Sequence, residues 1–116
     1  MDFSFTKADR LLKRADFLRL SQSGKKIQNR YFLAFVCPGP ADRTRFGVTV
    51  TRKVGNAVTR NRIKRLCREH FRLNKHTITG NWDINIIAKK PSADLSTDPF
   101  FSALQNIFDK LPVDDH

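Results

Sequence analysis

The spacing of hydrophobic and polar positions changes several times along the chain, and each change predicts a new element. Residues 1–12 form a basic lead-in that we expect to be extended, and residues 14–22 have the pattern of a helix that ends at Gly24. A β-rich run at residues 30–37 leads into a turn rich in Pro, Gly and Asp. This part of the chain therefore predicts a helix followed by a strand, with space for one extra short strand.

Residues 45–53 alternate between apolar and polar side chains, which is typical of a strand with one buried face. The apolar set comprises Phe46, Val48 and Val50, and the polar set comprises Thr49, Thr51 and Lys53. We expect this strand to pair antiparallel with the strand at residues 30–37 across the turn between them. The run at residues 82–91 predicts a third strand, and its nearly continuous apolar character favours a central place in the sheet.

Two further helices are predicted, one over residues 55–76 and one over residues 96–111. In the second, Asp98 is the expected N-cap and Pro99 the first helical residue. Its apolar stripe comprises Phe101, Leu104, Ile107, Phe108 and Leu111. The order α-β-β-α-β-α, with the optional extra strand, predicts a small α+β sandwich in which helices pack on a sheet.

The chain has 116 residues, of which 40% are hydrophobic, so it has room for one domain with one modest core. We expect a single domain over residues 1–116, with residues 112–116 as a flexible tail. Cys37 and Cys67 lack the spacing of a metal site or a CxxC pair, and we expect both to be reduced and packed. The sequence shows no apolar run of membrane-spanning length and no secretion signal, which favours a cytoplasmic protein.

The formal net charge of +11 indicates a polyanionic partner. Residues 1–90 carry +15 (21 basic less 6 acidic residues), whereas residues 91–116 carry −4 (1 basic less 5 acidic residues). The most basic run, at residues 57–72, has six Lys or Arg and a single acid, Glu69. We interpret this run as a nucleic-acid contact rather than an ordinary solvated helix face, because such faces usually mix both signs at helical spacing.

At roughly 100° per residue, the helix over residues 55–76 separates an apolar side from a basic side. The apolar side comprises Thr59, Ile63, Leu66, Cys67, His70 and Leu73. The basic side comprises Arg60, Asn61, Lys64, Arg65, Arg68, Arg72 and Lys75. Arg62 lies apart, near the apolar border, from which it can reach round the edge of the helix. Arg predominates over Lys, which suits bidentate contacts with phosphate and stacking on bases.

A second candidate surface follows from the alternation in the strands. The run at residues 30–37 places Phe32, Ala34 and Val36 in the core. The opposite face would combine aromatic, hydroxyl and cationic side chains: Tyr31, Leu33, Phe35, Thr49, Thr51, Lys53, Asn85, Ile87 and Lys89. Phe17 of the first helix is expected at its border. Stacking rings beside cations suit single-stranded nucleic acid, although each ring taken alone fits a core position nearly as well.

The run FGVTVTRKVGNAVTRNRIKRLCREHFR at residues 46–72, followed by WDINIIAKKP, closely resembles the protein component of bacterial ribonuclease P. RNRIKRLCRE carries the Arg-Asn-Arg signature of that family, preceded by a matching KVGNAV. The resemblance extends from about Leu11 to the closing helix. It implies a small α+β fold with an unusual left-handed crossover, which general rules would not predict because parallel crossovers are overwhelmingly right-handed.

The resemblance implies a protein subunit that binds a large catalytic RNA and the single-stranded 5′ leader of precursor tRNA. Protein and RNA together hydrolyse the bond that frees the leader, with Mg²⁺ held mainly by the RNA and no organic cofactor. The residues assigned to the catalytic RNA are Asn56, Arg60, Asn61, Arg62, Lys64, Arg65 and Arg68. The residues assigned to the leader are Phe17, Tyr31, Phe35, Thr49, Thr51, Arg52, Lys53, Lys89 and Lys90.

The sequence departs from the family pattern in the region that follows Phe17. Many members place a second aromatic residue about one turn after the Phe17 position, where this chain reads LRLSQS. Leader stacking is then expected to be weaker or to shift onto Phe35 and Tyr31. The protein alone is expected to be a monomer with no membrane partner.

The residues also bear on two other functions, a metal-dependent nuclease and a structural RNA-binding protein. A metal-dependent nuclease needs carboxylates that converge on its cations, whereas the acids of the first 90 residues are scattered: Asp2, Asp9, Asp16, Asp42, Glu69 and Asp83. We interpret Asp16 as fixing the first helix, Asp83 as an edge or turn residue beside Trp82, and His70 as a packed histidine. A structural RNA-binding protein of ribosomal type fits the composition equally well, and only the resemblance argues against it.

Overall fold

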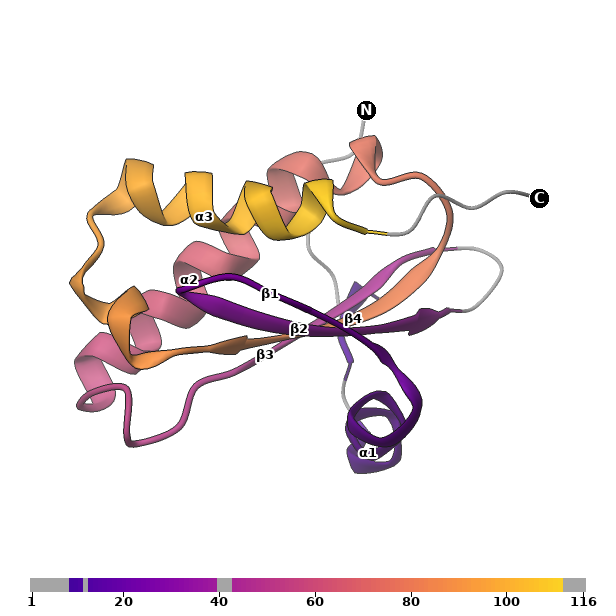
Figure 1. Ribbon diagram of the computed structural model, residues 1–116, viewed down its shortest axis with the longest axis horizontal. Coiled ribbons are helices and arrows are strands. Elements are labelled where there is room, and N and C mark those ends of the chain that lie inside the picture. Colours follow the sequence, from indigo (N-terminus) through magenta and orange to yellow (C-terminus); the bar gives the residue numbers. More distant parts are fainter. Residues whose placement is uncertain (1–8, 12, 40–42, 112–116) are drawn as a thin grey trace.

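The computed structural model describes residues 9–11, 13–39 and 43–111 (Figure 1). Most of the predicted lead-in and the whole predicted tail at residues 112–116 lie outside them. The described residues form one mixed sheet in the order β1-β2-β4-β3. Its strands are β1 (Lys25–Gln28), β2 (Phe32–Pro38), β3 (Arg45–Thr49) and β4 (Trp82–Ala88). The optional short strand of the sequence pattern is β1, which pairs antiparallel with β2.

The predicted pairing of the two consecutive strands β2 and β3 is wrong. β4 lies between them, antiparallel to β2 and parallel to β3. β4 carries the most continuously apolar run, and the central position buries both of its faces, as the sequence predicted. The connection from β3 to β4 is thus a crossover of parallel strands through a helix, and its left-handed course stays a prediction of the resemblance.

Three α-helices pack on this sheet. They are α1 (Arg14–Ser23), α2 (Ala57–Asn74) and α3 (Thr97–Asp109), joined by the short 3-10 turns η2 (Lys75–Thr77) and η3 (Lys90–Asp94). α2 and α3 lie on one side of the sheet and α1 lies on the other (Figure 1). The sandwich therefore has a thick side of two helices and a thin side covered by a single helix, in agreement with the predicted α+β class.

The main core lies between the sheet and the pair α2 and α3. Phe46 of β3 stacks on Phe71 of α2, with ring centroids 4.5 Å apart, and Phe32 of β2 meets Phe100 of α3 edge-on at 5.1 Å. Both α2 and α3 are rotated slightly from their predicted orientations. Phe71 is buried while Leu73 is 40% exposed, and Phe100 rather than Phe101 is fully buried.

The predicted ends of the helices need two corrections. α3 begins after Ser96, so Asp98 lies in its first turn and is not the N-cap. Pro99 is accommodated there because the first amides of a helix need no intrahelical partner. Gly24 does end α1, but its φ of −75° is not left-handed. Glycine is required at that position because a Cβ would collide with the carbonyl oxygen of Leu20.

Candidate nucleic-acid interface

The outer side of α2 carries the basic stripe that the sequence predicted. Asn56 caps the helix, since its Oδ1 accepts a hydrogen bond from the backbone N–H of Thr59 at 2.9 Å. Beyond this cap, Asn61, Arg65 and Arg68 are exposed. The helix therefore starts at a fixed point and presents these side chains to the solvent over two turns.

Cations on this stripe differ in whether an acid neutralises them. Glu69 pairs with Arg72 on the next turn. Within the described part of the chain, Lys64, Arg65 and Arg68 have no acidic side chain within 4 Å. Three like charges within two turns repel one another. An external polyanion would relieve that repulsion.

Arg60 and Arg62, the two arginines of the signature, lie at opposite borders of the outer face. Nη2 of Arg62 donates to the carbonyl oxygen of Leu95 at 2.9 Å, and its guanidinium lies 6.0 Å from the ring centroid of Phe100. Arg62 thus reaches round the helix edge, as predicted, and ties α2 to the segment before α3. Arg60 is half-buried, and its Nε is buried without a hydrogen-bond partner among the described residues. Arg60 is therefore less accessible than Arg65 and Arg68 on the same basic side of the helix.

The side of the sheet opposite α2 and α3 is only partly covered by α1. Two rows of side chains cross β2, β4 and β3 on this side: Phe35, Asn85 and Gly47 in one, and Leu33, Ile87 and Thr49 in the next. All but Asn85 and Gly47 are partly exposed. We call these six residues the open face. Their combination of ring, aliphatic, amide and hydroxyl groups is the one that strand alternation predicted.

Phe17 of α1 borders the open face, as predicted. Its ring lies so close to Gly47 that a Cβ at this position would approach ring carbon Cε1 to 2.8 Å. Phe17 and Phe35 also pack against a small cluster formed by Leu11, Leu20 and Cys37. The absence of a side chain at Gly47 therefore makes room for a ring over the sheet.

Further cations gather at one end of the open face. β3 and β4 are parallel, so their C-terminal ends lie at the same edge of the sheet. Thr51, Arg52 and Lys53 follow β3 and are exposed, and Lys90 follows β4 and is also exposed. Lys89 is less available, since its Nζ donates to Oε1 of Gln28 at 2.9 Å and to the carbonyl oxygen of Asn29 at 2.7 Å.

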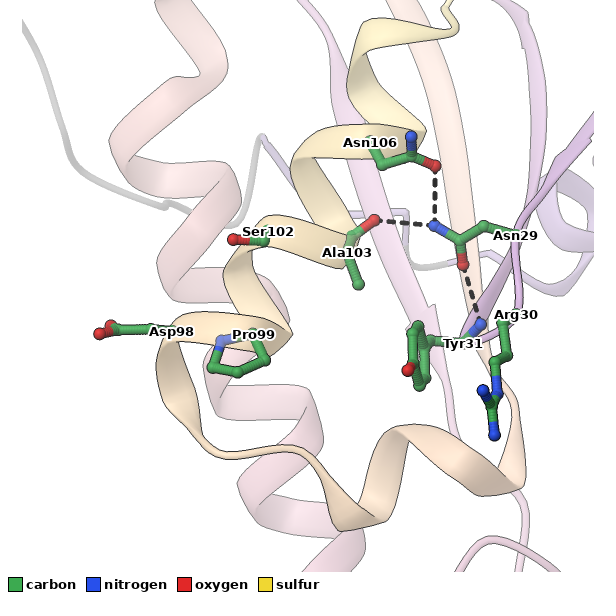
Figure 2. A pocket seen from close by; sticks show the side chains of 8 residues that line it. All are labelled: Asn29, Arg30, Tyr31, Asp98, Pro99, Ser102, Ala103 and Asn106. Carbon is green, nitrogen blue, oxygen red and sulfur yellow. Dashed lines mark hydrogen bonds between the residues drawn. The ribbon is translucent and has the colours of Figure 1, made fainter.

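Tyr31 does not share the open face, and that part of the prediction is wrong. The residue lies just before β2, where the alternation of the strand does not extend, and its ring packs against the main core. Figure 2 shows the ring in a shallow pocket of about 650 Å³ beside Pro99 and Ala103 of α3. Asn29 builds this turn, because its Oδ1 accepts from the backbone N–H of Tyr31 and its Nδ2 donates to the carbonyl oxygen of Ala103, both at 2.9 Å.

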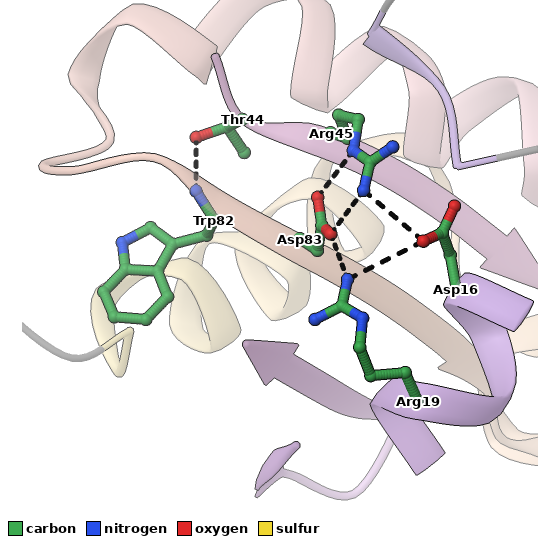
Figure 3. Close-up of polar contacts among 6 residues, drawn as sticks. All are labelled: Asp16, Arg19, Thr44, Arg45, Trp82 and Asp83. Carbon is green, nitrogen blue, oxygen red and sulfur yellow. Dashed lines mark hydrogen bonds and ion pairs between the residues drawn. The ribbon is translucent and has the colours of Figure 1, made fainter. Parts of the chain in front are cut away.

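Sequence reasoning missed a cluster of charges under α1 (Figure 3). Asp83 is fully buried in the central strand β4 rather than at an edge or turn. Arg45 of β3 binds this carboxylate bidentately, donating hydrogen bonds from Nε at 2.8 Å and from Nη2 at 2.7 Å. Arg19 of α1 binds the same carboxylate. Asp16 lies 3.5 Å from Arg45 and 3.8 Å from Arg19, which agrees with its predicted role in fixing α1.

The remaining titratable groups of interest are packed rather than exposed. Burial raises the pKa of the Cys67 thiol well above its usual range, and Cys37 is likewise free and buried. Burial also lowers the pKa of His70, against smaller opposing contributions from Gln105 and Asp109. His70 is thus a packed histidine, as predicted, and its lowered pKa favours the neutral form. In the described ranges, no three residues among His, Cys, Asp and Glu are grouped so as to hold a metal ion.

No helix within the described residues combines the length and the apolar character that a membrane span requires.

The family model described as Ribonuclease P matches residues 5–112 of the chain. The ribonuclease P protein component of Desulforapulum autotrophicum is 53% identical over 109 residues, which cover 94% of this chain and 93% of that protein. That of Desulfatibacillum aliphaticivorans is 49% identical, with coverages of 94% and 92%.

Solved structures of two RNase P proteins are similar to the fold. The Staphylococcus aureus protein has a TM-score of 0.82 and 36% identity, over 89% of this chain and 94% of that one. The Thermotoga maritima protein has a TM-score of 0.82 and 34% identity, over 89% and 97% of the two chains.

Proposed function

The chain belongs to the Ribonuclease P protein family, and we propose that it binds the catalytic RNA through α2 and the 5′ leader of precursor tRNA through the open face. The family is that of a protein subunit of an endoribonuclease with an RNA partner. Cleavage of the leader at the mature 5′ end of tRNA, by a catalytic centre and Mg²⁺ ions held in the RNA, is the activity that this chain would promote. It would act as a monomer in the cytoplasm.

The observation that carries the proposal is the unneutralised charge of α2. Lys64, Arg65 and Arg68 share one side of the helix and lack acidic partners in the described ranges. Arg side chains bind phosphate oxygens bidentately, so this side suits a folded RNA backbone. The guanidinium of Arg62 and the cap at Asn56 hold the start of the helix in place, so both residues support this surface.

The open face supports the leader assignment for a different reason. Phe17 and Phe35 offer rings, whereas Thr49 and the exposed cations Arg52 and Lys53 offer contacts to a backbone. An aromatic surface bordered by cations binds single strands with little dependence on sequence. The protein would therefore favour precursor tRNA over mature tRNA, which lacks the leader.

The deciding experiment is cleavage of precursor tRNA at low Mg²⁺ by a bacterial ribonuclease P RNA of a related source. Reactions contain the RNA alone, the protein alone, or both. We expect activity only in the mixture, because a protein of net charge +11 lowers the repulsion between two RNAs. Cleavage by the protein alone would contradict the assignment of catalysis to the RNA, and an inactive mixture would contradict the proposed function.

A further inference from the structure

We propose that Asp83 and Arg19 are positioning residues for the leader surface, by which we mean the open face together with Phe17 at its border. Their ion pair fixes α1 so that Phe17 stays over Gly47. This inference rests on the proposed function, since it concerns how the leader surface is held. Neither residue needs to touch RNA. Asp83 has no exposed surface, and Arg19 directs its guanidinium toward Asp83 (Figure 3).

Among the described residues, α1 makes few apolar contacts. Leu20 is the only buried residue of the helix, and the cluster that it joins contains two other buried residues from the described ranges, Leu11 and Cys37. The Lys13 N-cap forms no side-chain capping bond, and Leu18 on the outer side is 45% exposed. A ten-residue helix with so small an apolar contact is marginal by itself.

The charges beneath α1 come partly from the sheet and partly from the helix itself. Asp83 lies on the central strand β4 and Arg45 on its neighbour β3, and their bidentate contact forms the sheet's half of the cluster. α1 supplies the other half from residues three apart, Asp16 and Arg19, which lie on one side of the helix. The two acids of the cluster balance its two cations, so the buried carboxylate of Asp83 is not left uncompensated.

The charge cluster and the open face are neighbours on the same side of the sheet. Phe17 belongs to the same turn of α1 as Asp16, and its ring lies over the next row of the sheet. Along β3 that row begins at Gly47, two residues beyond Arg45, and the Phe17 ring lies against it. A tilt or shift of α1 would therefore move the ring along the sheet. The ion pair between Arg19 and Asp83 opposes that movement.

The test compares holoenzymes that carry Arg19→Gln or Arg14→Gln. Both changes remove one positive charge from α1, but Arg14 is exposed and forms no ion pair with a described residue. The measured quantity is the ratio of affinities for precursor and mature tRNA. We expect Arg19→Gln to lower this ratio by about threefold to tenfold, and Arg14→Gln to leave it nearly unchanged.

A double-mutant cycle separates positioning from direct binding. If Arg19 acts through Phe17, then Arg19→Gln should have little further effect on the ratio in a Phe17→Ala background. Fully additive effects would overturn the inference, as would equal losses from Arg19→Gln and Arg14→Gln. A Phe17→Ala variant with an unchanged ratio would overturn the leader assignment itself, so the two failures are distinguishable.

A second measurement requires no RNA. Hydrogen exchange of the free protein should show faster exchange of the α1 amides in Arg19→Gln, with the amides of β2 and β4 unchanged. Equal protection of α1 in the wild-type protein and the variant would show that the ion pair does not hold the helix, and the inference would then be wrong.

Discussion

The two sides of the sheet are closed in different ways. Among the described residues, nineteen buried hydrophobic side chains form the core under α2 and α3, whereas three form the cluster under α1. On the α1 side, ion pairs supplement the small apolar contact, since a fully buried Asp83 binds one arginine from the sheet and one from the helix. A large apolar core fixes the helix that would bind the catalytic RNA. Directional ionic contacts fix the helix that would shape the leader surface.

The difference shows how one small domain can combine a large core with a partly exposed sheet surface. On one side, α2 and α3 cover the sheet with the large apolar core. On the other side a single short helix covers only part of the strands, and the row of Leu33, Ile87 and Thr49 stays partly exposed. Covering that row with more apolar side chains would increase stability at the expense of the proposed binding surface.

The largest effect is expected from the α2 side of the sheet. Phe46→Ala removes a ring that stacks on Phe71 and meets Phe108 edge-on at 6.2 Å, and should lower the free energy of unfolding by about 3–5 kcal/mol. Urea unfolding followed by the fluorescence of Trp82 measures the loss. Leu20→Ala on the α1 side is the matched comparison and should cost less, because its smaller cluster can relax. An equal or greater loss for Leu20→Ala would contradict the division between the two sides.

The next largest effect is expected on RNA binding. Replacing Arg65 and Arg68 together by Ala should weaken binding to the catalytic RNA by about 3 kcal/mol, since hydrogen bonds to charged groups contribute about 1.5–3 kcal/mol each. The slope of log K against log salt should fall by about 0.7–0.9 per lost phosphate contact. Filter binding over a salt series measures both quantities.

The same double variant should keep its stability, because both side chains are exposed and lack acidic partners among the described residues. Arg72 provides the matched control, since it is already paired with Glu69 on the same helix. An equal loss of affinity from Arg72→Ala would mean that overall charge, rather than the unneutralised stripe, determines binding.

A smaller and more selective effect is expected from the open face. Phe35→Ala should reduce the preference for precursor over mature tRNA by about 1–3 kcal/mol if a base stacks on the ring. Binding of the catalytic RNA should remain nearly the same. Phe101→Ala is the matched control, because this ring is also partly exposed but lies on α3, on the far side of the sheet. A loss of leader preference in both variants would contradict the placement of the leader.

The sequence predicted those parts of the molecule whose signal is local. Ile63, Leu66 and Cys67 are all buried at the spacing that placed them on one side of a helix, and the apolar run of β4 correctly indicated a central strand. Strand alternation also identified the open face around Phe35. These predictions succeed because a period of two or 3.6 residues fixes which side chains share a face.

The parts that sequence reasoning missed depend on contacts between distant segments. The expected hairpin of β2 and β3 was wrong because adjacency in sequence does not reveal that β4 inserts between them. Asp83 was misplaced because its partners, Arg19 and Arg45, lie 64 and 38 residues away. Tyr31 was assigned to the wrong side because the alternation was extended one residue beyond the start of β2.

The smallest effect concerns His70, a titratable group inside the α2 side. Its pKa is lowered in the folded state by burial, beside the rings of Phe101 and Phe108. The unfolded chain keeps the ordinary histidine pKa of about 6.5, so below that pH it binds the proton more readily than the folded protein does. The free energy of unfolding should therefore be highest above that pH and should fall as the solution is acidified. The change in the free energy of unfolding from this one group cannot exceed about 1.4 kcal/mol per pH unit.

Urea unfolding between about pH 7 and pH 5 measures this effect. The free energy of unfolding should decrease less in His70→Gln than in the wild-type protein. If the free energy of unfolding changed with pH in the same way in both proteins, burying a charge at His70 would cost nothing. The α2 side would then tolerate a charge as readily as the α1 side, and the contrast between the two sides would be wrong.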